Sequence, residues 1–367
     1  MHQVTTHSER SSVRDVVKQT VPPSPSKPTY RHSDMSRAID KSFRLLGAKF
    51  LHKHAKRLTS QLDPASAGED IEGVHQARVA SRRLRAALNM FADCFPSGSV
   101  KRWRKAIRRI TNGLGEARDH DVQIQFLADH LAQLNDARHT RGIATLLGDL
   151  ERERAKCQPQ VVKVVQRLRR SEALEDILQT TRSIRSRAKS KGIDVRSSLT
   201  IKRSQHCLTE CLAELYDHAD GLGDPSAAAE HHAMRIAAKH LRYTLEMVMP
   251  VFAGELDSSL VALKELQTLL GEIHDCDVWD TRIDQFEQEM RRRTVNHFGS
   301  EAPFQPLEAG LEDLRETCRQ RRQDMFDQLC RCWADRPLAQ LEASNNPHAQ
   351  EWSARCGNER SICCKAR

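Results

Sequence analysis

The stretch that decides the fold reads VHQARVASRRLRAALNMFADCF at residues 74–95, and it aligns without a gap with HHAMRIAAKHLRYTLEMVMPVF at residues 231–252. A shorter motif follows each copy, where LGEARDHDV at residues 114–122 matches LGEIHDCDV at residues 270–278. A repeat of roughly 156 residues is far longer than the unit of a solenoid. We therefore expect two homologous helical halves, related by a pseudo-two-fold axis.

Both long stretches have the spacing of an amphipathic helix. Each copy has an apolar face, which holds Leu84 in the first copy and Leu241 in the second. A histidine and three cations lie roughly opposite that face: His75, Arg78, Arg82 and Arg85 in the first copy, and His232, Arg235, Lys239 and Arg242 in the second. We call these two sets the first and the second basic stripe.

The basic stripes carry only positive charge. Exposed helix faces normally mix the two signs, because like charges three or four residues apart oppose the helix by roughly a few tenths of a kcal/mol. A solvated face is the alternative interpretation for a single helix. The match of four positions across two halves favours a shared binding constraint instead.

Further basic residues flank the stripes. Arg108 matches Lys264 in the second half and extends the candidate site. Additional candidates are Lys53, Arg57, Arg83, whose counterpart is His240, and Arg104. Arginine binds phosphate oxygens through two parallel hydrogen bonds, whereas lysine acts as a point charge. We expect these side chains to converge on a basic groove or pore, where phosphate would favour the protonated form of the histidines.

Composition supports a helical protein with an anionic partner. The formal net charge is +9 and the isoelectric point is about 9.1, a balance that favours polyanions. Charged residues make up 29% of the chain and aromatic residues only 5%. This composition suits amphipathic helices better than a β-rich core, so we predict an all-α protein.

The helical region is predicted at residues 36–340, with a first half at about 38–190 and a second at about 196–335. Residues 1–35 are rich in Ser and Pro and predict a disordered leader, whereas residues 341–367 predict a polar, flexible tail. No apolar run reaches the roughly 18 residues that span a bilayer, and the N-terminus lacks the apolar segment of a secretory signal. We expect a cytoplasmic protein without membrane association, whose scattered cysteines are reduced.

Each short motif holds a group of acids: Glu116, Asp119 and Asp121 in the first, and Glu272, Asp275 and Asp277 in the second. Carboxylates bind divalent cations, but we favour a structural role for Asp119, Asp121, Asp275 and Asp277. In that role Asp119 or Asp121 caps the next helix, or pairs with an arginine and holds it in place.

The sequence lacks the common catalytic motifs. It has no glycine-rich phosphate loop, no Gly-x-Ser-x-Gly and no His-Glu-x-x-His. Cys207 with Cys211, and His274 with Cys276, lack the paired spacing of a zinc site. We therefore expect no catalytic residue, no bound metal and no cofactor.

The duplicated pattern resembles the CHAD family, named for conserved histidines in an α-helical domain. The resemblance rests on the string His-x-x-Arg-x-x-x-Arg-Arg-Leu-Arg from His75 and its downstream Leu-Gly-x-x-x-Asp, and it covers about residues 38–335. It implies two antiparallel four-helix bundles about a pseudo-two-fold axis, with a basic central groove or pore that binds polyphosphate. By position, the implied binding residues are the two basic stripes with Arg108 and Lys264. The chain is expected to be a stand-alone member that localises to polyphosphate granules.

The expected function is therefore non-catalytic binding of inorganic polyphosphate. Nucleic acid is the second candidate partner, but aromatic rings that could stack on bases are scarce, with Trp103 and Tyr243 nearest to the stripes. A metal-dependent polyphosphate or phosphate hydrolase is a third interpretation, because the acids could hold Mg²⁺. A purely structural scaffold comes last, since it gives no reason for two matched basic stripes. The sequence assigns no oligomeric state.

Overall fold

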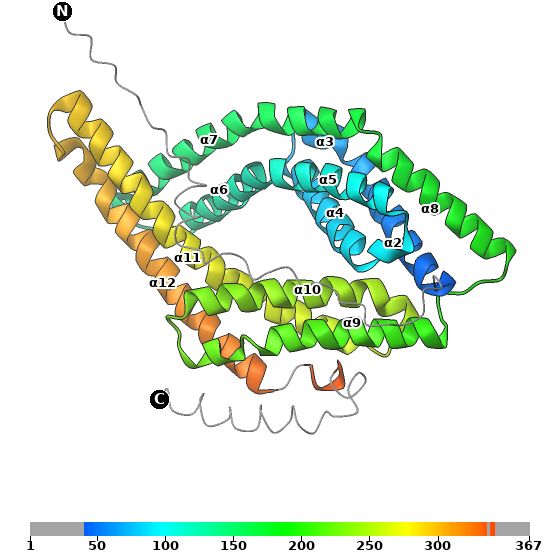
Figure 1. Ribbon diagram of the computed structural model, residues 1–367. Helices are drawn as coiled ribbons and strands as arrows, with labels where there is room; N and C mark the ends of the chain where they lie inside the picture. The colour runs from blue at the N-terminus through cyan, green and yellow to red at the C-terminus, as the bar shows by residue number, and fades with distance from the viewer. Residues whose placement is uncertain (1–39, 336–337, 342–367) are drawn as a thin grey trace, which may run out of the picture. The chain divides into compact units, whose positions relative to one another are not determined.

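In the computed structural model the structure describes residues 40–335 and 338–341. The predicted leader, residues 1–35, lies outside the described residues, as does the predicted tail except for its first residue. The described residues form helices and no β-strand (Figure 1). This confirms the all-α prediction for the part of the chain that the structure describes.

The helices begin and end as follows: α2 Lys41–Ser60, α3 Leu62–Ala67, α4 Ile71–Met90, α5 Ser97–Gly113, α6 Gly115–Gln133, α7 Ala137–Arg170, α8 Ala173–Ser190, α9 Ser198–Tyr216, α10 Ala228–Phe252, α11 Asp257–Phe298 and α12 Gln305–Ala334. Short 3-10 helices lie at Ala92–Cys94, Ala219–Gly223 and Ala302–Phe304. Asp40, Asp70 and Asp136 cap α2, α4 and α7, because each side chain accepts a hydrogen bond from the backbone N–H two residues later.

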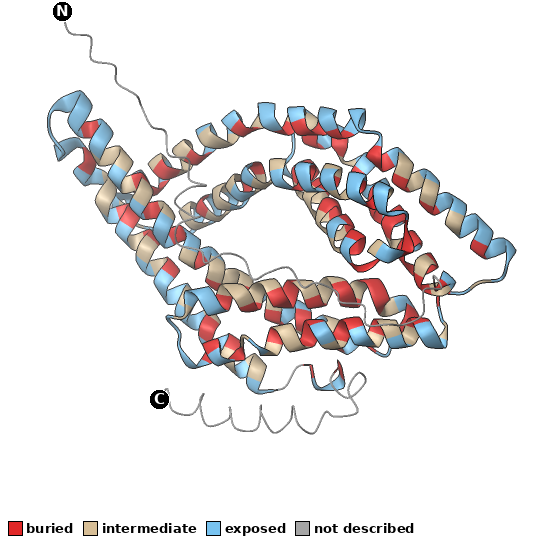
Figure 2. Cartoon of the chain, viewed as in Figure 1, coloured by how far each residue is buried: buried red, intermediate tan, exposed pale blue. Residues whose placement is uncertain are grey.

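The helices of the N-terminal part pack around α2 and α4. Helix α2 lies between α4 and α8, and α5 packs against α4 and α7. The apolar face predicted for residues 74–95 is buried in these contacts, since Ala77, Ala80 and Leu84 are each 0% exposed. In Figure 2 buried residues lie where helices meet, whereas much of α8 faces solvent.

The helices of the C-terminal part pack around α10 and α11. Helix α10 contacts α9 and α11, and α11 contacts α12. Helix α10 also contacts α4 and α2, so the two long motifs of the repeat lie on neighbouring helices (Figure 1). Where the N-terminal part has two helices, α5 and α6, separated at Leu114, the C-terminal part has the single 42-residue helix α11.

A core of buried side chains joins the two parts of the chain; we call it the apolar cluster. Its residues come from α6, α7, α11, α12 and the 3-10 helix before α12: Leu127, Ile143, Leu146, Leu150, Cys276, Trp279, Ile283, Phe286, Phe304, Leu311, Leu314 and Cys318. Helices α6 and α7 precede residue 191 and α11 and α12 follow it, so the hydrophobic effect holds the N-terminal and C-terminal parts together here.

Helices α7 and α12 approach each other closely at two glycines. A Cβ atom on Gly142 would overlap the carbonyl oxygen of Leu307, and one on Gly310 would overlap the carbonyl oxygen of His139. The two overlaps are reciprocal, because each glycine meets the residue three positions before the other. Absence of a side chain at both positions therefore sets the distance between these helices.

Candidate anion-binding site

The first basic stripe lies on α4. Because the opposite face of α4 is buried, the stripe is turned away from the core. His75, Arg78 and Arg82 are half-buried, and Arg85 is exposed. The second basic stripe lies on α10, where burial is greater.

On α10, His232, Arg235 and Arg242 are half-buried, and Lys239 is only 9% exposed. Burial lowers the pKa of the Lys239 ammonium to about 7, with further lowering by Arg235 and by two arginines of α4, while Asp275 opposes the shift. A lysine this strongly perturbed is held among like charges with little water to screen them.

Side chains from the two stripes converge where α4 contacts α10. The positive charge of Arg82 lowers the pKa of both Arg235 and Lys239, and the charge of Arg78 also lowers the pKa of Lys239. The guanidinium carbon of Arg82 lies 5.9 Å from the centre of the Tyr243 ring on α10. We call Arg78, Arg82, Arg235 and Lys239 the basic cluster. Four cations placed this close repel one another, so the cluster favours a multivalent anion.

Two aspartates flank the basic cluster. Asp119 on α6 accepts a hydrogen bond from Arg78 at 3.4 Å, and Arg78 also donates to the carbonyl oxygen of Thr111 at 3.4 Å. Burial lowers the pKa of Arg78 and of Arg235, and Asp119 and Asp275 respectively oppose those shifts. These carboxylates offset part of the repulsion within the cluster.

The other two aspartates of the short motifs bind arginines outside the cluster. Asp121, 2% exposed, accepts a hydrogen bond from Arg154 of α7 at 2.5 Å. Asp277 accepts one from Arg322 of α12 at 2.6 Å. Of the two structural roles expected for Asp119 and Asp121, helix capping is wrong, because both lie inside α6, which begins at Gly115 without a side-chain cap. Pairing with an arginine is the role that the structure shows.

The two predicted histidines have different neighbours. His75 has its pKa lowered by burial and then by Arg118. The Nδ1 atoms of His232 and His274 lie 3.2 Å apart. Burial, followed by Arg235 and His232, lowers the pKa of His274 to about 3. A neutral imidazole has one N–H, so when both rings are neutral the hydrogen bond between the two Nδ1 atoms leaves only one N–H of the pair to donate to an anion.

Arg118 and His274 were not among the predicted binding residues. They occupy the same position of the two short motifs, and each lies beside the histidine of its own basic stripe. The signal was present, because a basic residue or histidine stands at this position in both motifs.

Several predicted residues are held by other parts of the protein. Arg83 donates two hydrogen bonds to Glu246, at 2.8 and 3.1 Å. Arg242 donates to Glu246 at 3.0 Å and to Gln267 at 2.9 Å. Arg104 donates to the carbonyl oxygen of Leu88 at 2.8 Å. These contacts give the three arginines a role in joining helices.

The remaining predicted cations are exposed. Arg85 and Arg108 lie close enough that Arg108 contributes to a lowered pKa of Arg85, after burial and Arg82. Arg85 therefore extends the basic cluster toward α5. Lys264 is exposed on α11, and among the described residues no hydrogen bond or ion pair joins its side chain to the cluster.

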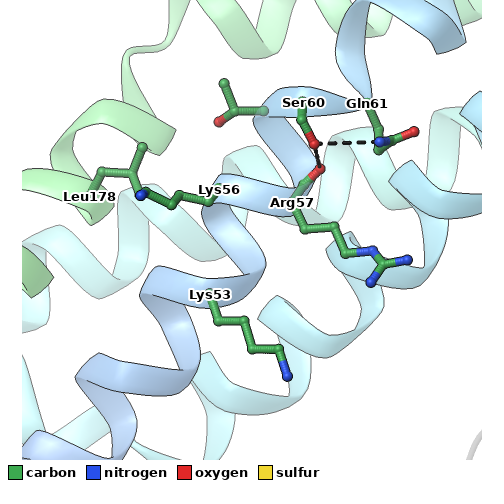
Figure 3. A pocket seen from close by; sticks show the side chains of 7 residues that line it. Lys53, Lys56, Arg57, Ser60, Gln61 and Leu178 are labelled. Atoms are coloured by element: carbon green, nitrogen blue, oxygen red, sulfur yellow. Dashed lines mark hydrogen bonds between the residues drawn. The ribbon is translucent and has the colours of Figure 1, made fainter.

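A depression of about 710 Å³ lies beside the N-terminal part of the site (Figure 3). It is lined by Lys53, Lys56, Arg57, Thr59, Ser60, Gln61 and Leu178. In Figure 3, Lys53 and Arg57 extend to one side of α2, and Lys56 extends toward Leu178 of α8. Arg57 donates a hydrogen bond to Gln76 at 2.5 Å and contributes to the lowered pKa of His75. The depression thus adjoins the first basic stripe.

No helix within the described ranges has both the length and the apolar character needed to cross a bilayer.

The fold and the site together define an all-helical protein in which two matched basic helices contact each other. The CHAD domain profile matches residues 49–284, and the chain belongs to the CHAD family. The crystal structure of the CHAD domain from the plant Ricinus communis is similar, with a TM-score of 0.51 and 21% sequence identity over 87% of this chain and 98% of that chain. This similarity shows a shared fold.

PptA from Streptomyces chartreusis is another similar structure, with a TM-score of 0.47 and 16% identity over 78% of this chain and 98% of that chain. No curated protein matches the sequence.

Proposed function

We propose that this protein binds inorganic polyphosphate, without catalysing a reaction on it, through the basic cluster and the two basic stripes. The observation that carries the proposal is the position of Lys239, buried to 9% exposure beside Arg235, Arg82 and Arg78. Such a cluster costs free energy in the unbound protein, and a chain of phosphates relieves that cost along its whole length. Membership of the CHAD family supports the same conclusion.

We infer that the two halves of the repeat form two homologous antiparallel four-helix bundles about a pseudo-two-fold axis, with the basic cluster lining a groove or pore between them. The contact of α4 with α10 and the reciprocal approach of Gly142 and Gly310 support this arrangement. A groove between two equivalent helices suits a linear ligand, because neighbouring phosphates can meet equivalent side chains.

Nucleic acid is a weaker candidate partner. Trp103 is 0% exposed and donates its indole N–H to Asp176 at 2.9 Å, so it offers no ring for a base. The Tyr243 ring has the guanidinium carbons of Arg82 and Arg83 at 5.9 and 5.8 Å from its centre. Base stacking would have to displace these arginines.

A metal-dependent hydrolase is also less well supported. Glu272 forms an ion pair with Arg321 at 2.7 Å, and Asp277 forms one with Arg322 at 2.6 Å. Asp121 is bound by Arg154. These pairs reduce the negative charge that a Mg²⁺ site needs.

The decisive experiment is calorimetric titration of the full chain with long-chain polyphosphate, using the double variant Arg78→Glu with Arg235→Glu. Reversing two charges of the basic cluster should lower the affinity by at least about a hundredfold, since each arginine contributes charge-assisted hydrogen bonds. For the unaltered protein we expect a log–log salt slope of about −5 to −6 if about eight phosphates are neutralised. Single-stranded DNA and RNA serve as competing polyanions.

The matched control is Arg167→Glu with Lys202→Glu, which changes the net charge equally. Both residues are exposed, on α7 and α9, and neither helix contributes to the basic cluster. Equal losses in the two double variants would show that general basicity, and not the cluster, binds the polyanion. Circular dichroism establishes that each variant is folded.

Binding of this kind would place the protein on polyphosphate granules. A fluorescent fusion should co-localise with granules in polyphosphate-accumulating cells and become diffuse when the cluster is charge-reversed. Granule localisation that survives the reversal would contradict this part of the proposal.

A further inference from the structure

Three metal-ligating side chains meet between α6 and α7, outside the basic cluster. Glu116 and His120 are four residues apart on α6, which places them on one face of that helix. Cys157 lies on α7, which packs against α6. One ligand atom from each of the three residues lies within 4.8 Å of the others.

The environment of this group suits a bound ion. Cys157 is 9% exposed, His120 is half-buried and Glu116 is exposed, so the site opens to solvent at one side. The Nδ1 atom of His120 is buried and has no hydrogen-bond partner in the described part of the chain. A buried ring nitrogen without a partner is costly and requires an explanation. Coordination of a metal ion through that nitrogen would give it a partner.

The charges around the group are mixed. The negative charges of Glu116 and Glu153 act to raise the pKa of both His120 and Cys157. Arg154 opposes them at Cys157, and Arg282 opposes them at His120. Arg282 is itself bound to Glu153 at 2.6 Å. Glu116 remains as a carboxylate that can neutralise a bound cation.

We propose that Glu116, His120 and Cys157 bind a divalent transition-metal ion of the zinc type. One sulfur, one nitrogen and one oxygen ligand suit zinc or cobalt, whereas magnesium and calcium prefer oxygen ligands alone. Three protein ligands leave a position for a solvent molecule. Binding forms a bond from the metal to the Cys157 sulfur and releases the thiol proton to solvent.

The second half of the repeat shows what replaces the group. Glu272 and Cys276 have the same spacing on α11 as Glu116 and His120 have on α6. There Glu272 is bound to Arg321 of α12 by an ion pair of 2.7 Å. The acid that corresponds to Glu116 is thus bound by an arginine of α12. The metal site would be present in one half only, where an ion would connect α6 to α7 as the arginine connects α11 to α12.

The position of the site gives it a connection to the basic cluster. Arg118 and Asp119 lie between Glu116 and His120 on the same turns of α6, and Asp119 accepts a hydrogen bond from Arg78. An ion that fixes these turns against α7 also fixes Asp119. The metal proposal does not rest on polyphosphate binding, and its test contains no polyphosphate.

The test is titration of the full chain with Co²⁺ under reducing conditions. Its background variant has Cys356, Cys363 and Cys364 replaced by serine, which removes the thiols of the C-terminal tail. We expect one equivalent of Co²⁺ to give visible ligand-field bands and a near-ultraviolet thiolate-to-cobalt charge-transfer band, with zinc displacing the cobalt. Cys157→Ser should abolish the charge-transfer band, and His120→Gln and Glu116→Gln should each weaken binding by at least about tenfold.

The matched control is Cys276→Ser, which removes a buried thiol at the same spacing from an acid in the second half. It should leave the charge-transfer band unchanged. A band that persists in Cys157→Ser, or cobalt that binds without one, would overturn the proposal. Because Glu116 is exposed, Glu116→Gln should fold normally, so unchanged zinc affinity in that variant would also count against the site.

Discussion

The two basic stripes share a sequence pattern but differ in how the protein holds them. Arg82 on α4 is half-buried and its counterpart on α10, Lys239, is 9% exposed. Arg85 is exposed, whereas its counterpart Arg242 is fixed by Glu246 and Gln267. The first stripe is therefore open to solvent at its end, and the second is partly built into the packing. Duplication has kept the charges while the two copies have diverged in burial and partners.

Glu246 provides the largest test of this difference, because it binds Arg83 of the first half and Arg242 of the second. Its side chain is 15% exposed. Glu246→Gln should lower the free energy of unfolding by about 3 kcal/mol, since two partly buried guanidinium groups lose their counter-charge. Denaturant unfolding followed by circular dichroism measures the change.

The matched control for Glu246 is Glu214→Gln, which removes the acid that lies 3.2 Å from His240, the counterpart of Arg83. His240 is 44% exposed, so solvent screens this pair and we expect a loss of about 0.5 kcal/mol or less. Equal losses of unfolding free energy in the two variants would show that the Glu246 link between α4 and α10 contributes no more stability than the exposed Glu214–His240 pair.

Lys239 provides the second test, through pH. Its pKa is lowered to about 7, by burial and then by Arg235, Arg82 and Arg78, with Asp275 opposing. A bound polyanion raises that pKa again, so binding takes up a proton, and polyphosphate affinity should fall on the order of tenfold between pH 6.5 and pH 8.5. Lys239→Arg does not titrate in this range and should bind with much less dependence on pH. The same pH dependence in both proteins would contradict the assignment.

Protein stability should respond to Lys239 with the opposite sign. The unfolded chain keeps a lysine pKa near its ordinary value, so between about pH 7 and pH 10 the unfolded state binds more protons than the folded state. The contribution of Lys239 to the free energy of unfolding therefore rises with pH through that window. Below pH 7 the destabilisation caused by burying its ammonium is fully present. Thermal unfolding of the unaltered protein and of Lys239→Arg, both without ligand and across this pH range, separates the contribution of Lys239 from that of other titrating groups.

Arg85 and Arg242 provide the smallest test. Arg85→Ala should weaken polyphosphate binding by about fivefold, because this exposed side chain can turn to a phosphate. Arg242→Ala should weaken it only about twofold, because Glu246 already satisfies the Arg242 guanidinium. Calorimetric titration of the two variants compares them directly. A larger loss of affinity for Arg242→Ala than for Arg85→Ala would contradict the conclusion that the first stripe is the one open to solvent.

The pairing of positions across the repeat could be predicted from sequence, because the two copies could be compared residue by residue. The apolar and basic faces of α4 followed from helical spacing. The interruption at Leu114 could not be predicted, since α11 passes through the matching Leu270 without a break. Identical Leu-Gly-Glu sequences have different geometry there, so the surrounding packing decides it.

Contacts between distant segments were also beyond sequence reasoning. Asp121 and Arg154 are 33 residues apart, and Asp277 and Arg322 are 45 apart. The Cys157 thiol joins Glu116 and His120 from another helix and forms no local motif with them. Such contacts depend on how α6 packs against α7, which periodicity alone does not determine.

The apolar cluster has a consequence for how the chain can be divided. It is built from helices on both sides of Lys191 and Gly192, so a cut at that loop leaves each fragment with one face of an unfinished core. Neither fragment alone could bury the side chains that it contributes to the apolar cluster. Each fragment would expose an apolar surface that is prone to aggregation. Co-expressed as separate polypeptides, the two fragments should recombine into a native-like heterodimer through this core. In that case the loop at Lys191 and Gly192 would serve only to connect the two parts of the chain, and the apolar cluster would hold them together.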